Sequence, residues 1–230
     1  MDFSMKEYCL GNIPGICERQ AEQFSAYFHM LIDWNSRMNL TAITEPLQVA
    51  QKHFMDSLLP MALIPENASV IDVGTGAGFP GVPLAIMRPD IKLTLLDSLN
   101  KRIIFLTELC AALRLDARCI HARAEDGGRR AELRERFDIA TSRAVANVSA
   151  LAEYTVPFLK VGGASLMYKG PQAPDELASG KRALELLCCE AEIHSFPAPW
   201  GERTVIALTK QRPTAPAYPR KAGTAEKKPL

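Results

Sequence analysis

An aspartate and three glycines occur together in the first third of the chain, in an order that suits a cofactor-binding turn. Asp72 is followed by Val73 and then by Gly74, Gly76 and Gly78. Because glycine has no Cβ atom, a ligand can approach such a backbone closely. A buried strand, a glycine loop and a helix together form the nucleotide-cofactor corner of a doubly wound α/β sheet. The spacing therefore predicts a cofactor with a nucleotide part, although glycines alone do not say which.

The acidic residue before the glycines distinguishes between two kinds of cofactor. A dinucleotide places an anionic pyrophosphate at such a turn, where the carboxylate of Asp72 would repel it. S-adenosylmethionine has no phosphate and carries an ammonium and a sulfonium group, which a carboxylate favours. The sequence therefore favours S-adenosylmethionine. A nicotinamide cofactor and a glycine-rich turn without any ligand are the alternatives.

Polar residues also follow the other predicted parallel strands, at the carboxyl ends where doubly wound sheets bind ligands. Asp97 is placed to bind ribose hydroxyls, although it could equally cap a helix. Ala124 and Glu125 could receive the adenine. Arg143 and Lys169 end two further strands and would bring cations to the same rim, with surface ion pairs as the alternative. Together these strand ends predict one binding rim.

The elements that position these residues follow from the hydrophobic pattern. Apolar residues at helical spacing predict a helix over 17–38 and another over 46–61, with Thr44 as the N-cap of the second. Short apolar runs typical of buried parallel strands alternate with helices from residue 69 onward. The predicted strands cover 69–73, 92–97, 117–121, 137–142, 164–168, 192–196 and 204–209, and helices cover 100–113 and 175–189.

This order predicts an α/β fold of the class I methyltransferase (Rossmann-like) type. Its seven-stranded, mostly parallel sheet would end in an antiparallel hairpin and carry an N-terminal helical extension. We expect residues 1–65 to form that extension, packed on the core, and residues 66–211 to form the S-adenosylmethionine-binding domain. Residues 212–230 would form a basic, proline-containing tail.

Charge is distributed unevenly between the body of the chain and this tail. Residues 210–230 hold six Lys or Arg and one acid, whereas the other 209 residues hold 21 basic and 25 acidic residues. The four prolines after residue 212 predict an extended rather than helical tail. Such a tail suits a polyanion such as RNA, and a solvated, disordered end is an equally good interpretation.

Composition and missing motifs exclude several classes of function. The sequence shows no long apolar run, no signal-peptide pattern and no C-x-x-C pair among its six cysteines, which predicts a cytoplasmic protein without a membrane or metal site. It has no Asn-Pro-Pro-aromatic sequence for adenine amino methylation and no Pro-Cys for attack on a pyrimidine. Guanine N7 needs neither device and no general base, so no catalytic residue is predicted. Of the four histidines only His53 merits a test, and a structural role is the better interpretation for it.

Several motifs together resemble the RsmG (GidB) family, which methylates N7 of one guanosine in the 530 loop of 16S rRNA, guanosine-527 by family convention. The likeness covers nearly the whole chain. It lies at residues 34–43, 53–58, 72–81, 97–102, 123–125, 142–146, 169–170, 201–203 and 218–223.

The resemblance implies S-adenosylmethionine contacts and RNA contacts at matching positions. The cofactor contacts that it implies are Gly74, Phe79, Ala124, Glu125 and Arg143, and the pattern of the loop and strand ends adds Asp72, Gly76, Gly78, Asp97 and Ser98. It implies RNA contact by basic residues of the rim and tail, for which we expect Lys169, Arg203, Arg220 and Lys221. The partner would be 16S rRNA or a small-subunit assembly intermediate, and the protein would act as a monomer. A small-molecule methyltransferase, an oxidoreductase and a non-catalytic RNA-binding module are the alternatives.

Overall fold

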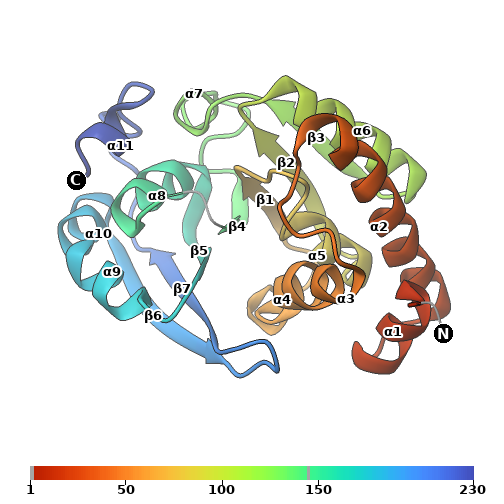
Figure 1. Cartoon of the computed structure of the whole chain (residues 1–230). Coiled ribbons are helices and arrows are strands. Elements are labelled where there is room, and N and C mark those ends of the chain that lie inside the picture. The colour runs from red at the N-terminus through yellow and green to blue at the C-terminus, as the bar shows by residue number, and fades with distance from the viewer. Residues whose placement is uncertain (1–2, 144–145) are drawn as a thin grey trace.

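The sheet and its strand order confirm the predicted fold class. A computed structural model describes residues 3–143 and 146–230. Within these residues seven strands form one sheet in the order β3-β2-β1-β4-β5-β7-β6 (Figure 1). The strands β1 to β5 pair in parallel, and β7 runs antiparallel to both β5 and β6. Their bounds are β1 Ser69–Val73, β2 Lys92–Asp97, β3 Ala117–His121, β4 Phe137–Arg143, β5 Leu159–Lys169, β6 Cys189–Phe196 and β7 Arg203–Lys210.

Helices cover both faces of this sheet, in two groups that follow the order of the chain. The first group is α1 Met5–Asn12, α2 Glu18–Met38, α3 Pro46–Val49, the π-helix η1 Ala50–Met55, α4 Asp56–Leu58, the 3-10 helix η2 Met61–Leu63, α5 Gly81–Met87 and α6 Asn100–Ala112. The second is α7 Ala124–Gly127, α8 Val148–Thr155, the 3-10 helix η3 Val156–Phe158, α9 Ala173–Ser179, α10 Lys181–Leu187 and α11 Thr224–Lys227.

Two hydrophobic clusters, one on each face, explain why the parallel strands read as continuous apolar runs. Successive side chains of a strand point to opposite faces of the sheet. In β1, Val70 accordingly belongs to the cluster with α2 and α5, whereas Ile71 and Val73 belong to the cluster with α8 and α10. A parallel sheet covered on both faces needs apolar residues at nearly every strand position.

The N-terminal extension is packed into the first cluster. Phe24, Tyr27 and Leu31 form the apolar stripe of α2, and all three side chains are fully buried. The hydroxyl of Tyr27 donates to the carbonyl oxygen of Ala77, in the glycine loop, at 2.6 Å. The extension thus supports the loop that is expected to bind the cofactor.

Several local predictions were wrong or incomplete. The helix over 46–61 is divided into α3, η1 and α4, and its N-cap is Glu45 rather than Thr44, because the Glu45 carboxylate accepts from the amides of Leu47 and Gln48. The helix over 175–189 divides at Gly180, where an added Cβ would lie 3.0 Å from Val148 of α8. Strands β5 and β6 begin five and three residues earlier than predicted, at Leu159 and Cys189. Helix α1 was not predicted.

The C-terminal tail is folded rather than extended. It contains the short helix α11, which lies beside α8 (Figure 1). Arg134 donates to the carbonyl oxygens of Thr214 and Tyr218 at 2.8 and 2.9 Å. Backbone carbonyls of the tail thus accept hydrogen bonds from a side chain in the body of the protein. These contacts outweigh the preference of a proline-containing sequence for an extended chain.

Candidate active site

The glycine loop has the backbone conformation that its sequence predicts, but its glycines are required for different reasons. Gly74, Gly76 and Gly78 have φ angles of 70°, 61° and 102°, in the left-handed region that favours glycine. An added Cβ on Gly78 would lie 2.7 Å from the hydroxyl of Tyr27, so this glycine admits α2 rather than a ligand. An added Cβ on Gly76 would meet nothing within 4 Å, which leaves that part of the loop accessible to a cofactor.

Asp72 lies beneath the loop and makes its hydrogen bonds within the protein, and its contact with the cofactor stays a prediction. Its side chain is fully buried. Oδ2 accepts from the hydroxyl of Thr75 at 2.6 Å and from the amide of Gly81 at 3.0 Å, and Oδ1 accepts from the hydroxyl of Thr141 at 3.0 Å. The carboxylate therefore holds the loop and α5 in place. Burial raises the pKa of Asp72 to about 6, although these three hydrogen bonds oppose the rise.

We expect Asp72→Asn to remove one component of the pH dependence of folding. Because the folded-state pKa is about 6 and the ordinary value 3.8, the carboxyl takes up a proton on folding between these values. Its contribution to stability is greatest below the lower value and is lost as the pH rises through the higher one, by an amount on the order of 3 kcal/mol. Asparagine does not titrate. The free energy of unfolding of the variant, relative to that of the wild type, should therefore rise by about this amount between about pH 4 and pH 7.

Urea unfolding of both proteins across this pH range measures the difference. The matched control is Asp33→Asn, because Asp33 is exposed and pairs with Arg37 on the surface of α2. A difference between Asp72→Asn and wild type that stays constant with pH would contradict the assignment of this pKa.

Most of the remaining predicted cofactor residues line one cavity of about 120 Å³ at the ends of β1, β2 and β3. Asp97 has two roles there: its Oδ2 accepts from the amide of Gly76 at 2.9 Å, and its Oδ1 accepts from the amide of Leu99, just before α6, at 2.9 Å. Asp97 therefore holds the glycine loop and the N-cap residue of α6, and its contact with ribose hydroxyls stays a prediction. The lining residues are Val73, Gly74, Leu96, Asp97, Ser98, Ala122, Arg123, Ala124, Glu125, Tyr154, Gly223 and Glu226.

The tail closes one side of this cavity, which sequence reasoning missed. Glu125 is 5% exposed, and its Oε1 accepts from the amide of Gly223 at 2.7 Å. Tyr154, from α8, and Glu226, from α11, line the same wall. Gly223 and Glu226 reach the cavity only because the tail docks on the body of the protein.

The chemical groups that line the cavity are suited to an adenosine group. Buried carboxylates on Asp97 and Glu125 can accept hydrogen bonds from hydroxyl and amino groups, and small residues border the space. Gly74 and Ala124 would allow a flat ring to approach the backbone. These residues would hold the nucleoside part of S-adenosylmethionine, which supplies an electrophilic methyl group when bound.

A second cluster, around Phe79, lies beyond the other end of the glycine loop. The Phe79 ring stacks on His53 at a centroid distance of 4.5 Å and on Tyr27 at 5.2 Å. The guanidinium of Arg143 lies 5.0 Å from the centroid of the same ring. Arg143 and Phe79 thus lie side by side, and their contact with the cofactor stays a prediction. Ala144 and Val145, which belong to the arginine motif, lie outside the described residues.

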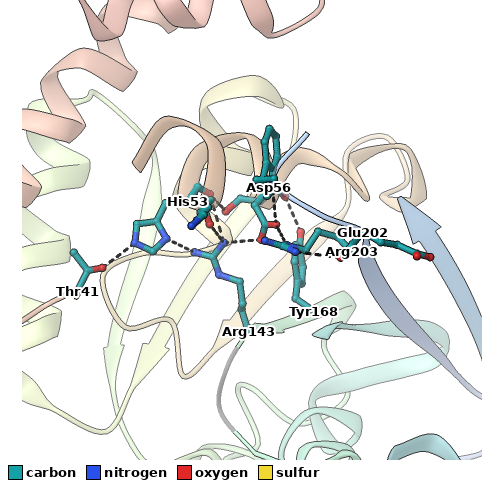
Figure 2. Close-up of polar contacts among 10 residues, drawn as sticks. Thr41, His53, Asp56, Arg143, Tyr168, Glu202 and Arg203 are labelled. Atoms are coloured by element: carbon teal, nitrogen blue, oxygen red, sulfur yellow. Dashed lines mark hydrogen bonds and ion pairs between the residues drawn. The ribbon is translucent and has the colours of Figure 1, made fainter. Parts of the chain in front are cut away.

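His53 is a neutral, hydrogen-bonded member of this cluster (Figure 2). Burial and the nearby Arg143 lower its pKa to about 4. Nη2 of Arg143 donates to Nδ1 of His53 at 3.5 Å, which places the remaining ring proton on Nε2, where it is donated to the hydroxyl of Thr41 at 2.8 Å. A structural role for His53 agrees with this arrangement.

Three of the four predicted RNA-binding cations are held by carboxylates within the chain. Lys169 pairs with Glu176 at 2.7 Å, Arg203 with Asp56 at 2.6 Å, and Arg220 with Glu153 at 2.6 Å. The charges of Lys169 and Arg220 thus take part in holding the fold, and contact of these cations with RNA stays a prediction. Lys221 is exposed.

Within residues 3–143 and 146–230, no helix is long and apolar enough to span a membrane. The same residues contain no group of His, Cys, Asp and Glu that could hold a metal ion.

Solved structures with the same fold include methyltransferases of several kinds. An O-methyltransferase from Bacillus cereus in complex with SAH has a TM-score of 0.58 at 15% identity, over 89% of this chain and 96% of that one. TYW2 from M. jannaschii in complex with AdoMet has a TM-score of 0.53 at 19% identity, over 70% of this chain and 77% of that one. At these identities the likeness shows the class I methyltransferase fold alone.

Sequence comparisons identify the family. The family model described as rRNA small subunit methyltransferase G (GidB) matches residues 20–204. The proteins called ribosomal RNA small subunit methyltransferase G from Desulforamulus reducens and Clostridium perfringens are each 46% identical, over 94% and 98% of this chain and 92% and 97% of their own lengths. The chain therefore belongs to the rRNA small subunit methyltransferase G family, which confirms the resemblance seen in its motifs and S-adenosylmethionine as its cofactor.

Proposed function

We propose that this protein transfers a methyl group from S-adenosylmethionine to N7 of a single guanosine in the 530 loop of 16S rRNA, guanosine-527 by family convention. Family membership supports small-subunit rRNA as the substrate. The observation that supports N7 as the acceptor is the state of the ionisable groups around Phe79, because a general base would have to lie among them.

Each of these groups is already engaged or is not basic. Both ring nitrogens of His53 have partners, and its pKa of about 4 makes it a weak base. The hydroxyls of Tyr27 and Tyr168 donate to backbone carbonyls, and burial raises the pKa of each well above 10. Such a site suits a nucleophile that loses no proton when it is methylated, and guanine N7 is a nucleophile of this kind.

The chemistry then depends on orientation. The in-plane lone pair of N7 forms the new N–CH₃ bond while the S–CH₃ electron pair returns to sulfur, and the positive charge moves from sulfur to the guanine ring. No proton is transferred in this step. Holding two reactants in line contributes about 7–11 kcal/mol in well-oriented systems. The part of the protein is to hold the base and the methyl donor in line.

Trp200 is the aromatic side chain best placed to stack on the guanine. Phe79, Tyr168 and Trp200 are aromatic side chains that contact Arg143, Ser57 and Asp56, respectively. The Phe79 ring packs against both His53 and Tyr27, and Tyr168 is buried with its hydroxyl bound to the carbonyl of Ser57. Trp200 remains partly exposed in the β6–β7 loop. Aromatic stacking is worth about 1–3 kcal/mol per base.

A genetic test examines this function directly. We expect small-subunit rRNA from cells that lack the gene to be missing one 7-methylguanosine, which mass spectrometry of nuclease fragments would assign to the 530 loop. Re-expression of the wild-type chain should restore it, and re-expression of a variant that cannot bind the cofactor should not. An unchanged set of modified nucleotides would exclude the proposal, and loss of a different methylated base would correct the acceptor.

A tail deletion does not separate an rRNA substrate from a small-molecule substrate. Residues of the tail line the cofactor cavity, so removing residues 212–230 would impair either enzyme. A direct comparison of purified 16S rRNA, the small subunit and free guanosine as methyl acceptors makes this distinction instead.

A further inference from the structure

Asp56 joins three parts of the structure that are distant in sequence. It begins α4, immediately after the π-helix η1, and its side chain is 9% exposed. Oδ2 accepts from Nη1 of Arg143, at the end of β4, at 3.2 Å. Oδ1 accepts from Nε of Arg203, at the start of β7, at 2.6 Å and from Nε1 of Trp200 at 3.3 Å. Figure 2 shows both guanidinium groups converging on this carboxylate.

The π-helix completes the set of acceptors around Arg143. Nη1 also lies 3.4 Å from the carbonyl oxygen of Lys52 and 3.5 Å from that of His53, and Nη2 lies 3.5 Å from Nδ1 of His53. Short π-helical segments inside helices often occur at functional sites. The N-terminal extension thus fixes the Arg143 guanidinium in its place beside Phe79, and Asp56, at 3.2 Å, supplies the opposite charge.

The charges of Asp56, Arg143 and Arg203 do not cancel. Two guanidinium groups share one carboxylate, and His53 is neutral. Arg203 is more exposed than Arg143, 29% against 14% of the side chain. Nε and Nη1 of Arg203 have acceptors, whereas Nη2 makes no hydrogen bond to the described part of the chain. A guanidinium edge of this kind suits a phosphate oxygen.

We propose that Asp56 is a positioning residue for methyl transfer. It fixes Arg143 on the cofactor side and Arg203, with Trp200, against a backbone phosphate of the RNA. One carboxylate thereby sets where the donor and the acceptor of the methyl group lie relative to each other. The inference rests on the proposed function, because it takes the second ligand to be RNA.

The test separates the contact of Asp56 with Arg143 from its contact with Arg203. Calorimetry gives the dissociation constant of S-adenosylmethionine in the absence of RNA, and initial rates give KM for unmethylated small subunits. We expect Arg143→Met to raise the cofactor constant about tenfold, Arg203→Met to raise the RNA KM about tenfold, and Asp56→Asn to raise both. In the double variant Asp56→Asn/Arg203→Met the RNA KM should match that of Asp56→Asn, since Arg203 has already lost its ionic contact with residue 56 in the single variant.

Asp33→Asn is the matched control, since it removes the charge of an exposed aspartate paired with Arg37. A folded Asp56→Asn protein with a lower Tm but both constants within about twofold of wild type would show a purely structural role and overturn the proposal. Should Asp56→Asn fail to fold, Asp56→Glu keeps the charge, displaces the carboxylate and should raise both constants to a smaller extent. Unchanged constants in that variant would equally overturn it.

The design also separates this inference from the proposed function. If wild-type protein does not methylate 16S rRNA or small subunits, the proposed function fails. The effect of Asp56→Asn on the cofactor constant then still decides whether Asp56 acts through Arg143.

Discussion

Gly74→Asp is expected to abolish methylation and to weaken S-adenosylmethionine binding at least about a hundredfold while the protein stays folded. Gly74 lines the cavity of about 120 Å³ in which we expect the cofactor to bind, and its amide donates to the carbonyl oxygen of Leu96 at 2.9 Å. A carboxylate at this position would take up part of that small space. It would also add a fourth acid to a cavity already lined by Asp97, Glu125 and Glu226.

The backbone of Gly74 provides a well-matched control for this variant. Gly15 has a φ angle of 73°, close to the 70° of Gly74, and an added Cβ there would meet nothing within 4 Å. Gly15→Asp therefore imposes the same backbone strain and the same charge, away from the cavity. Calorimetry with S-adenosylmethionine, beside thermal unfolding of both variants, makes the comparison. Normal cofactor affinity in Gly74→Asp would place the cofactor elsewhere.

Arg220→Ala should release the C-terminal tail from the body of the protein. The guanidinium pairs with Glu153, whose side chain is 1% exposed, and Nε and Nη2 both donate to that carboxylate. Removing one partner of a buried ion pair typically costs about 3–5 kcal/mol, because the other charge stays buried without compensation. Undocking of the tail would let water reach Glu153, so we expect local opening to relieve most of this cost.

Hydrogen exchange measures that opening. The amides of the tail, including Gly223, should exchange much faster in Arg220→Ala, and cofactor affinity should fall because Glu125 loses its contact with the Gly223 amide. Lys221→Ala is the control, since Lys221 is the next residue and is exposed. If Arg220 served RNA instead, its removal would weaken RNA binding and leave tail exchange and cofactor affinity unchanged. The double variant Glu153→Gln/Arg220→Met, which removes both charges, should restore part of the docking.

The Gly74 prediction depends on a local sequence pattern, whereas the Arg220 prediction depends on a contact between residues that are far apart in the chain. The glycine loop could be predicted because its signal is local: left-handed backbone demands glycine, and buried parallel strands demand apolar runs. These requirements occur within a few residues, and the strands β1, β2 and β3 match their predicted bounds. The family motifs contain Asp56 as well, but no pattern in the sequence indicated what its carboxylate contacts.

The sequence by itself therefore determined the fold class, the cofactor and the strand ends at which Gly74, Asp97 and Arg143 lie. Only the tertiary structure decided how each charge is used. Asp72 is turned beneath the loop, Arg220 pairs with Glu153, 67 residues away, and Arg203 reaches Asp56 across 147 residues. Backbone conformation and burial depend on neighbouring residues, whereas the partner of a buried charge depends on which distant segment packs beside it. Desolvation makes that partner obligatory but does not say where in the chain it lies.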